Sequence, residues 1–328
     1  MTAASRLGRR WRELQLAPDG RPRPDAPFGQ GPLAARVLAL AIDAAVAFGS
    51  RLPPQVAHAL AVTGGTGEWA ARPGKRRRLG RNLARAVALS PEDRRVKRLV
   101  REEIVNEARR SADLLWALGR PAELLASVEL EGLEHVHAAV RPGNGLLLAG
   151  IHVGGWEVAT ALPEAVVPVP TTAIVADDWL AWSIEHTRRT AGLRVLYRTE
   201  SALRAARLLR RGEALLVLGD DGGDSPRGYP VRFVGTTAEL PAGIVSLARL
   251  CRSPIVSFYV LPLGPRRWRV TIDPPVAPPG RRAGAEGERR VLQQLADRWS
   301  EVIQAHPQHW AAVYPIRWLD EPAGGARR

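Results

Sequence analysis

The stretch Gly145-Leu146-Leu147-Leu148-Ala149-Gly150 decides the fold. It is a short apolar run with turn-forming residues at both ends, a pattern typical of a strand buried on both faces of a sheet. Helical stretches separate similar runs further along the chain. The apolar runs cover 171–175, 193–197, 214–218, 254–260 and 268–272, and the helical stretches cover 179–190, 201–211, 241–250 and 286–305. This alternation predicts an α/β fold with a mainly parallel central sheet flanked by helices.

The residues outside this core divide by composition. We expect a disordered basic tail over 1–30, an N-terminal helical region that contacts the membrane over 31–120, the α/β core over 121–320 and a polar tail over 321–328. Ser90-Pro91-Glu92-Asp93 predicts a helix start, with Ser90 as the N-cap. The most apolar stretch, 33–48, is about sixteen residues long and carries two charges, so we expect an interfacial or buried helix there and not a membrane span.

The composition indicates an anionic partner. The formal net charge is +14, and almost all of the basic residues are arginine, which pairs bidentately with phosphate and carboxylate. Anionic lipid headgroups, phosphate-bearing ligands and nucleic acid all fit this charge. The run Lys75-Arg76-Arg77-Arg78 is either a contact for anionic headgroups or a solvated basic face. Cys251 is the only cysteine, which excludes an internal disulfide and a cysteine-based zinc site.

The chemistry of the chain is concentrated just after the deciding strand, in His152-Val153-Gly154-Gly155-Trp156-Glu157. Ligands of open α/β sheets bind at the carboxyl ends of the strands, where His152 is placed. A turn at the glycine pair would fold Glu157 back towards the imidazole, so that one ring nitrogen is held by a carboxylate and the other can accept a proton. The Gly154 and Gly155 amides would offer donors to an oxyanion or phosphate. Alternatively, His152 fills a hole in the core and Glu157 lies at a solvated helix start.

The same segment resembles the histidine-x4-acid block of the lysophospholipid acyltransferase superfamily. It is most similar to the branch of lipid A late acyltransferases and phosphatidylinositol mannoside acyltransferases, whose block reads H-x-G-x-W-[ED]. His152, Gly154, Trp156 and Glu157 match that block. Further ordered similarities lie at 81–83, 131–135, 208–223, 228–243 and 306–318, so the resemblance covers about 31–318. Val234 departs from the pattern, where the family usually has a second phenylalanine. The ending Tyr314-Pro315-Ile316-Arg317-Trp318 departs too and favours the mannoside-type branch.

The resemblance implies an O-acyltransferase in which His152 is the general base and Glu157 its orienting partner. The donor would be acyl-CoA or acyl-carrier protein, the acceptor a sugar hydroxyl of a membrane glycolipid, and no cofactor or metal would be needed. The enzyme would lie on the cytoplasmic face of the plasma (inner) membrane as a peripheral or monotopic protein. Gly154, Gly155 and Trp156 would contact substrate. Other substrate-binding candidates are Arg188, Asp220, Asp221, Arg232 and Glu239.

Two other functions remain open at this point. A hydrolase would use the same base on water and release free fatty acid without an acceptor. A non-catalytic basic protein would bind an anionic membrane or nucleic acid in a salt-sensitive way that is independent of His152. The sequence contains no recognisable nucleic-acid-binding module, so we expect no nucleic-acid partner. Trp179 and Trp182 are candidates either for an interfacial anchor or for packing.

Overall fold

The structure is a computed structural model, and it describes residues 41, 44–140, 144–159, 162, 166–176, 194–198, 202–221 and 227–320. Several expectations fall outside these residues: the tail over 1–30, most of the apolar stretch 33–48, the helix over 179–190 with Trp179, Trp182 and Arg188, and the tail over 321–328. The structure describes elements from all the other segments that the sequence analysis singled out.

A seven-stranded sheet forms the centre of the protein, in the order β1-β9-β8-β2-β5-β3-β4. Only the β8–β9 pair is antiparallel, and the other neighbours run parallel. The predicted α/β class with a mainly parallel sheet is therefore confirmed. The strands are β1 (Val128–Glu131), β2 (Leu146–Gly150), β3 (Thr171–Val175), β4 (Arg194–Tyr197), β5 (Ala214–Leu218), β8 (Ile255–Gly264) and β9 (Arg267–Ile272).

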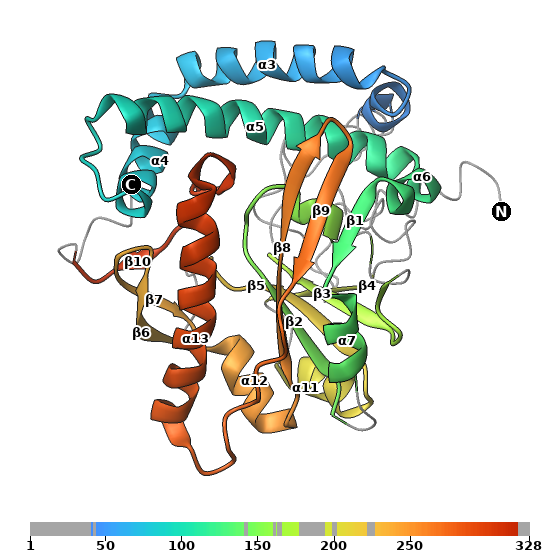
Figure 1. Cartoon of the computed structure of the whole chain (residues 1–328), viewed down its shortest axis with the longest axis vertical. Helices are drawn as coiled ribbons and strands as arrows, with labels where there is room; N and C mark the ends of the chain where they lie inside the picture. Colours follow the sequence, from blue (N-terminus) through green and yellow to red (C-terminus); the bar gives the residue numbers. More distant parts are fainter. Residues whose placement is uncertain are drawn as a thin grey trace, which may run out of the picture.

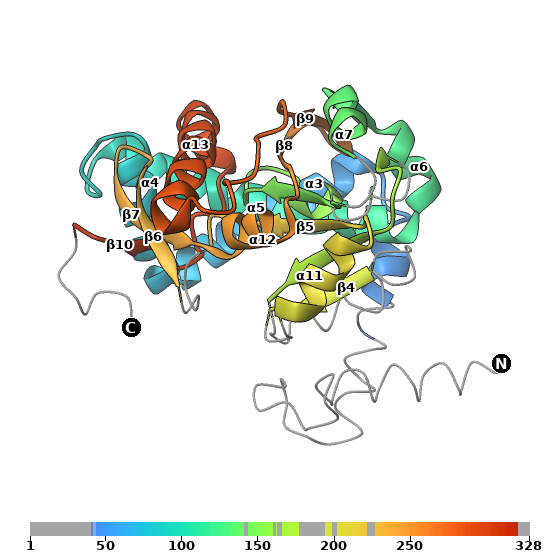
Figure 2. The same ribbon diagram turned by 90° about the horizontal axis from the view of Figure 1, so that it is seen from below.

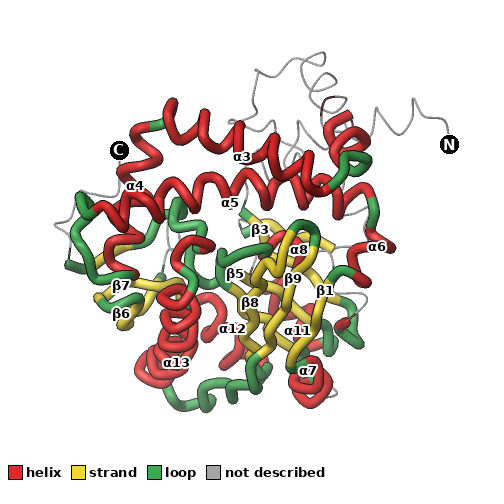
Figure 3. The backbone as a smooth tube through the Cα atoms, turned by 45° about the horizontal axis from the view of Figure 1, so that its top comes forward, coloured by secondary structure: helices red, strands yellow, loops and turns green. Residues whose placement is uncertain are grey.

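Helices cover both faces of this sheet (Figures 1 and 3). Strand side chains alternate between the faces, so Leu147 and Ala149 of β2 join one apolar core while Leu146 and Leu148 join another. All five residues of β2 are buried, which is the reason for its continuous apolar sequence. The covering helices are α6 (Pro121–Ala126), α7 (Leu133–Ala139), α8 (Trp156–Ala159), α11 (Ala202–Arg210), α12 (Gly243–Cys251) and α13 (Gly284–Ala305).

A second, three-stranded sheet lies beside α13 (Figures 1 and 2). It contains β6 (Gly228–Phe233), β7 (Thr236–Pro241) and β10 (Arg317–Trp318), all antiparallel. The turn between β6 and β7 has two residues, Val234 and Gly235, both at positive φ, which is the hairpin turn that matches strand twist. Sequence analysis did not predict this hairpin. Val234 is fully buried although its backbone is in a conformation that β-branched residues rarely adopt.

The N-terminal helices α3 (Pro54–Ala71), α4 (Pro73–Ala86) and α5 (Arg94–Gly119) pack on the core. Helices α3 and α5 run side by side along the top of the protein (Figure 1). The predicted helix start at Ser90 was wrong. The N-cap of α5 is Asp93, whose Oδ1 accepts a hydrogen bond from the Arg95 N–H (2.7 Å), and residues 90–93 form a turn before the helix. None of the helices within the described ranges is long and apolar enough to cross a bilayer.

The β8–β9 hairpin reaches out of the sheet to these helices. At its tip, Arg266 donates from Nη2 to the Leu52 carbonyl (2.6 Å) and lies over the Trp116 ring of α5 (5.2 Å to the ring centre). Sequence analysis placed the end of this strand at Val260, and the structure continues it to Gly264. The longer hairpin connects the core to the helices that precede it.

Candidate active site

Strand register brings His152 and Asp220 together. β2 and β5 are parallel neighbours, and their last residues, Gly150 and Leu218, are paired in register. His152 and Asp220 each follow two residues later, so both side chains lie at the carboxyl edge of the sheet. The distance between His152 Nδ1 and Asp220 Oδ1 is 2.7 Å.

The Asp220 carboxylate is surrounded by donors and only 1% exposed. It accepts from the His152 backbone N–H at 3.1 and 3.2 Å, from the His152 ring, and from the Trp310 indole N–H at 3.1 Å. Burial alone would raise the pKa of this carboxyl group, but the charge of His152 and these hydrogen bonds hold the pKa below its usual value. The carboxylate therefore stays ionised and keeps a proton on Nδ1 of the ring.

This arrangement defines the chemistry of the imidazole. Because Nδ1 carries the proton that Asp220 accepts, Nε2 presents a lone pair. The imidazole packs against the Tyr314 ring, with ring centres 3.9 Å apart. It also makes a T-shaped contact with the Trp156 ring, with ring centres 4.9 Å apart. Burial, together with the charges of Glu157 and Asp220, raises the pKa of the Tyr314 phenol, so Tyr314 remains neutral beside the base.

Gly154 and Gly155 do not bind an anion through their backbone amides, as the sequence had suggested. The Gly154 N–H donates to the His309 carbonyl (2.8 Å) and the Gly155 N–H to the Val260 carbonyl (3.2 Å). Neither amide is available to an oxyanion or a phosphate, so that interpretation was wrong. Gly154 has φ +59°, and an added Cβ would lie 1.9 Å from the Val260 carbonyl oxygen. The glycines allow the chain after β2 to pass directly against β8.

Gly154→Ala is therefore expected to destabilise the fold by about 3 kcal/mol or more, since it combines a strained φ with a backbone overlap. Thermal unfolding of the purified variant measures this effect. Gly64→Ala is the matched control: Gly64 is an exposed glycine in α3 whose added Cβ meets nothing within 4 Å. This control should gain about 0.5–1 kcal/mol. Equal melting temperatures for the two variants would contradict the close approach.

Glu157 lies in the first turn of α8 and is partly buried. The position on Nδ1 that sequence analysis gave to Glu157 is occupied by Asp220. Glu157 instead acts electrostatically on the Arg110 guanidinium of α5 and on Tyr314. Its carboxylate belongs to the same site, on the side that faces α5.

The remaining substrate-binding candidates lie in different parts of the fold. Asp221 follows Asp220 and pairs with Arg198 after β4 (2.9 Å). Arg232 is exposed on β6, where its backbone bonds to Gln293 of α13, and Glu239 on β7 pairs with Arg317 (3.0 Å). Both belong to the second sheet and make no contact with the histidine within the described ranges. Arg188 lies outside the described residues.

The structure adds two residues to the site that the sequence analysis did not propose for it. Trp310 and Tyr314 come from the C-terminal segment, which is held against β2 by the bond from the Ala311 N–H to the His152 carbonyl (2.8 Å). The available signal was the aromatic-rich similarity block at 306–318, which was used only for the family resemblance. The structure shows that this block forms one wall around the His152 ring.

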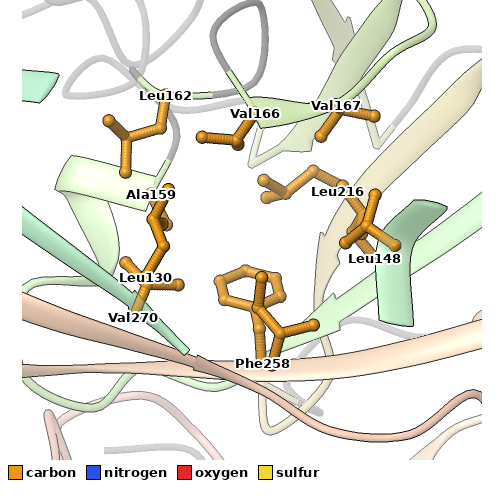
Figure 4. Close-up of a pocket in the computed structure, with 11 residues that line it drawn as sticks. Leu130, Leu148, Ala159, Leu162, Val166, Val167, Leu216, Phe258 and Val270 are labelled. Atoms are coloured by element: carbon orange, nitrogen blue, oxygen red, sulfur yellow. The ribbon is translucent and has the colours of Figure 1, made fainter. Parts of the chain in front are cut away.

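An apolar pocket lies on the sheet face that α7 and α8 cover (Figure 4). Its empty volume, which includes open space at the mouth, is about 430 Å³. α8 and β2 also flank His152 in sequence, so the pocket and the base share the same supporting elements. The wall is apolar throughout: Leu130, Val136, Leu148, Ala159, Leu162, Val166, Val167, Leu216, Phe258, Val270 and Ile272.

Comparisons with known proteins identify the family of the chain. The family model of bacterial lipid A biosynthesis acyltransferases matches residues 35–319. A curated relative, the phosphatidylinositol mannoside acyltransferase of Mycolicibacterium smegmatis, is 28% identical over 291 residues, covering 84% of this chain and 91% of the relative. Among solved structures, the 1-acyl-sn-glycerophosphate acyltransferase of Thermotoga maritima is similar at a TM-score of 0.37 and 15% identity, over 77% of this chain and 98% of that one.

The chain belongs to the bacterial lipid A biosynthesis acyltransferase family. It is an O-acyltransferase of lipid biosynthesis, and it takes an acyl donor and a lipid acceptor as substrates.

Proposed function

We propose that the protein transfers a fatty acyl chain from acyl-CoA or acyl-carrier protein to a sugar hydroxyl of a membrane glycolipid, of the phosphatidylinositol mannoside type. The observation that carries this proposal is the His152–Asp220 pair at the carboxyl edge of the sheet. Strand β2, which precedes His152, and helix α8, which follows it, also contribute to the lining of an apolar pocket. The name of the M. smegmatis relative supports the mannoside-type acceptor over a lipid A-type acceptor. The arginine-rich composition and the Tyr314–Trp318 ending support it as well.

The reaction follows from the geometry of the pair. The acceptor hydroxyl gives its proton to His152 Nε2 while its oxygen attacks the thioester carbonyl carbon. Asp220 stabilises the imidazolium that forms. When the carbonyl is restored, the C–S bond breaks, and the thiolate takes the proton from Nε2. A new ester and a free thiol result, with no acyl-enzyme and no further reactant.

The apolar pocket is the proposed site of the acyl chain. Its lining has no charged or polar side chain, so it suits a hydrocarbon tail. The membrane would lie against α3, whose Val56 and Leu60 are about half exposed, next to the basic helix α4. Such a combination of apolar and cationic side chains is typical of interfacial binding at anionic lipids. We place this contact on the cytoplasmic face of the plasma (inner) membrane.

The experiment that tests the proposal is a transfer assay with radiolabelled acyl-CoA and acyl-carrier protein, each offered to phosphatidylinositol mannoside and to a lipid A precursor. Labelled glycolipid from the mannoside acceptor is the expected product. Release of free labelled fatty acid at the same rate without any acceptor would identify a hydrolase and overturn the proposal.

Ala159→Phe should shift the preferred donor to a shorter acyl chain, because the larger ring fills part of the pocket from α8. Leu148→Ala should have the opposite effect, since it enlarges the pocket from β2. Competition between donors of different chain length, followed by mass spectrometry of the product, measures both shifts. Ala202→Phe, at an exposed position of α11, is the size-matched control. An unchanged chain-length profile in both pocket variants would place the acyl chain elsewhere.

A further inference from the structure

Helix α5 presents a group of hydrogen-bond donors to the active-site wall. Asn106 Nδ2 bonds to the Gln308 carbonyl (2.9 Å) and lies 3.4 Å from His309 Nδ1. His309 in turn accepts the Gly154 N–H through its carbonyl, two residues after His152. The side of α5 that carries Asn106 therefore lies against the segment that carries the base.

Each of the two arginines that follow on this helix has one or more buried N–H groups that make no hydrogen bond to the described residues. Arg109 Nη1 donates to Asn106 Oδ1 (3.1 Å), and Arg110 Nη2 donates to Glu103 Oε1 (3.0 Å). Arg109 Nε and both Arg110 Nε and Nη1 are buried without an acceptor among the described residues, while Glu103 Oε2 is the acceptor of the Arg110–Glu103 pair that is buried without a donor there. The Arg110 side chain is only 8% exposed. Buried donors without acceptors are costly, so they indicate a ligand with acceptor oxygens.

The titratable groups around these arginines are a histidine and three glutamates. Burial, with the charges of Arg110, His306 and Arg109, lowers the pKa of His309 to about 4, so its ring is neutral near pH 7. Its Nδ1 faces the Asn106 amide, so Nε2 carries the proton and adds one more donor. The carboxylates around Arg110 are Glu103, whose pKa burial raises to about 7, and Glu157. Glu107 is paired with Lys75 (2.6 Å).

We propose that Asn106, Arg109, Arg110 and His309 form a binding site for a phosphate ester of a substrate, where helix α5 meets the segment Pro307–His309. Two guanidinium groups and a neutral imidazole donate to the phosphate oxygens, which is the arrangement that arginine clusters use for phosphate. The site anchors the substrate next to His152 without taking part in proton transfer. This inference rests on the proposed function, because it assumes a phosphate-bearing substrate.

A binding titration tests the site without turnover. Inorganic pyrophosphate is titrated calorimetrically into the full chain in detergent, with the wild type, Arg109→Met and the control Arg98→Met. Arg98 lies on the same helix but is exposed, and its one ion pair within the described residues is with Glu102. We expect Arg109→Met to weaken binding by about tenfold or more and Arg98→Met to leave it unchanged. Equal affinity in all three proteins, or no binding to the wild type, would overturn the site.

Kinetics then identifies which substrate carries the phosphate. Arg109→Met and the double variant Glu103→Gln/Arg110→Met should raise KM about tenfold or more with kcat changed less than about threefold. The double variant avoids leaving the Glu103 carboxylate buried alone. An increase seen with acyl-CoA but not with acyl-pantetheine assigns the phosphate to the donor, and an increase for the glycolipid assigns it to the acceptor. A fall in kcat with both KM values unchanged would overturn the inference, and wild-type transfer by a His152 variant would overturn only the proposed function.

Discussion

His152→Ala is expected to lower the rate of acyl transfer by about 10²- to 10⁴-fold, the contribution of a positioned general base. The variant loses Nε2, the acceptor of the hydroxyl proton, while the donor and acceptor can still bind. The effect should therefore appear in kcat and leave KM nearly unchanged. Single-turnover rates with labelled donor at saturating glycolipid measure it.

Two controls accompany this substitution. His137→Ala removes an exposed histidine of α7 and should keep full activity. Circular dichroism and thermal unfolding show whether the His152 variant keeps its fold. We expect this because Asp220 still accepts hydrogen bonds from the backbone N–H of residue 152 and from the Trp310 indole. Transfer at the wild-type rate by a folded His152→Ala protein would remove the base from the mechanism.

Asp220→Asn should also lower kcat by about 10²- to 10⁴-fold, although it changes the side-chain shape very little. The aspartate accepts hydrogen bonds on both oxygens, from His152 on one side and from the Trp310 indole on the other. An amide must direct its NH₂ group at one of these donors. Facing the ring, it moves the proton from Nδ1 to Nε2 and abolishes the base; facing Trp310, it leaves a buried indole N–H unpaired.

The same variant should lose stability by about 1–3 kcal/mol, because an unpaired donor is left in a buried site. Asp297→Asn is the control, since Asp297 is exposed on α13 and, in the part of the chain that the structure describes, its side chain accepts from Gln293 alone. Rates and melting temperatures measured in parallel separate the two consequences. If Asp220→Asn were fully active while Glu157→Gln were inactive, Glu157 would be the partner of the imidazole and the pairing seen here would not be the functional one.

The fold was predictable where local pattern and burial agree. The run at 145–150 has no polar residue to mark an exposed face, so it indicated a strand covered on both sides, and β2 is buried at every position. The strand ends also located His152 and Asp220 at one edge of the sheet. Their direct contact could not be read from the sequence, because it depends on β2 and β5 being neighbours in register, and 63 residues separate the end of β2 from the start of β5.

The sequence misled where one residue type serves two purposes. Glycines after a strand are typical of anion-binding turns and also of close backbone contact, and only the position of β8 shows that Gly154 serves the second purpose. Ser90 and Asp93 are both good N-caps, and the turn before α5 makes Asp93 the one that is used. Trp310, Tyr314 and α5 come from parts of the chain that are distant from His152. The aromatic-rich block at 306–318 was visible in the sequence, but no local pattern could show that it contacts His152.

Helix α5 has a practical consequence for shortened versions of this enzyme. Val96 and Ile104 near its start belong to the apolar core on one side of the sheet, and Trp116 near its end belongs to the core on the other side. A shortened chain that begins at residue 121 would lack α5. Both apolar cores would then lose the side chains that α5 contributes, and Trp268 would lose its contact with Trp116. The shortest version worth expressing must therefore retain α5. The proposed membrane contact is better weakened by replacing Val56 and Leu60 of α3, which are about half exposed.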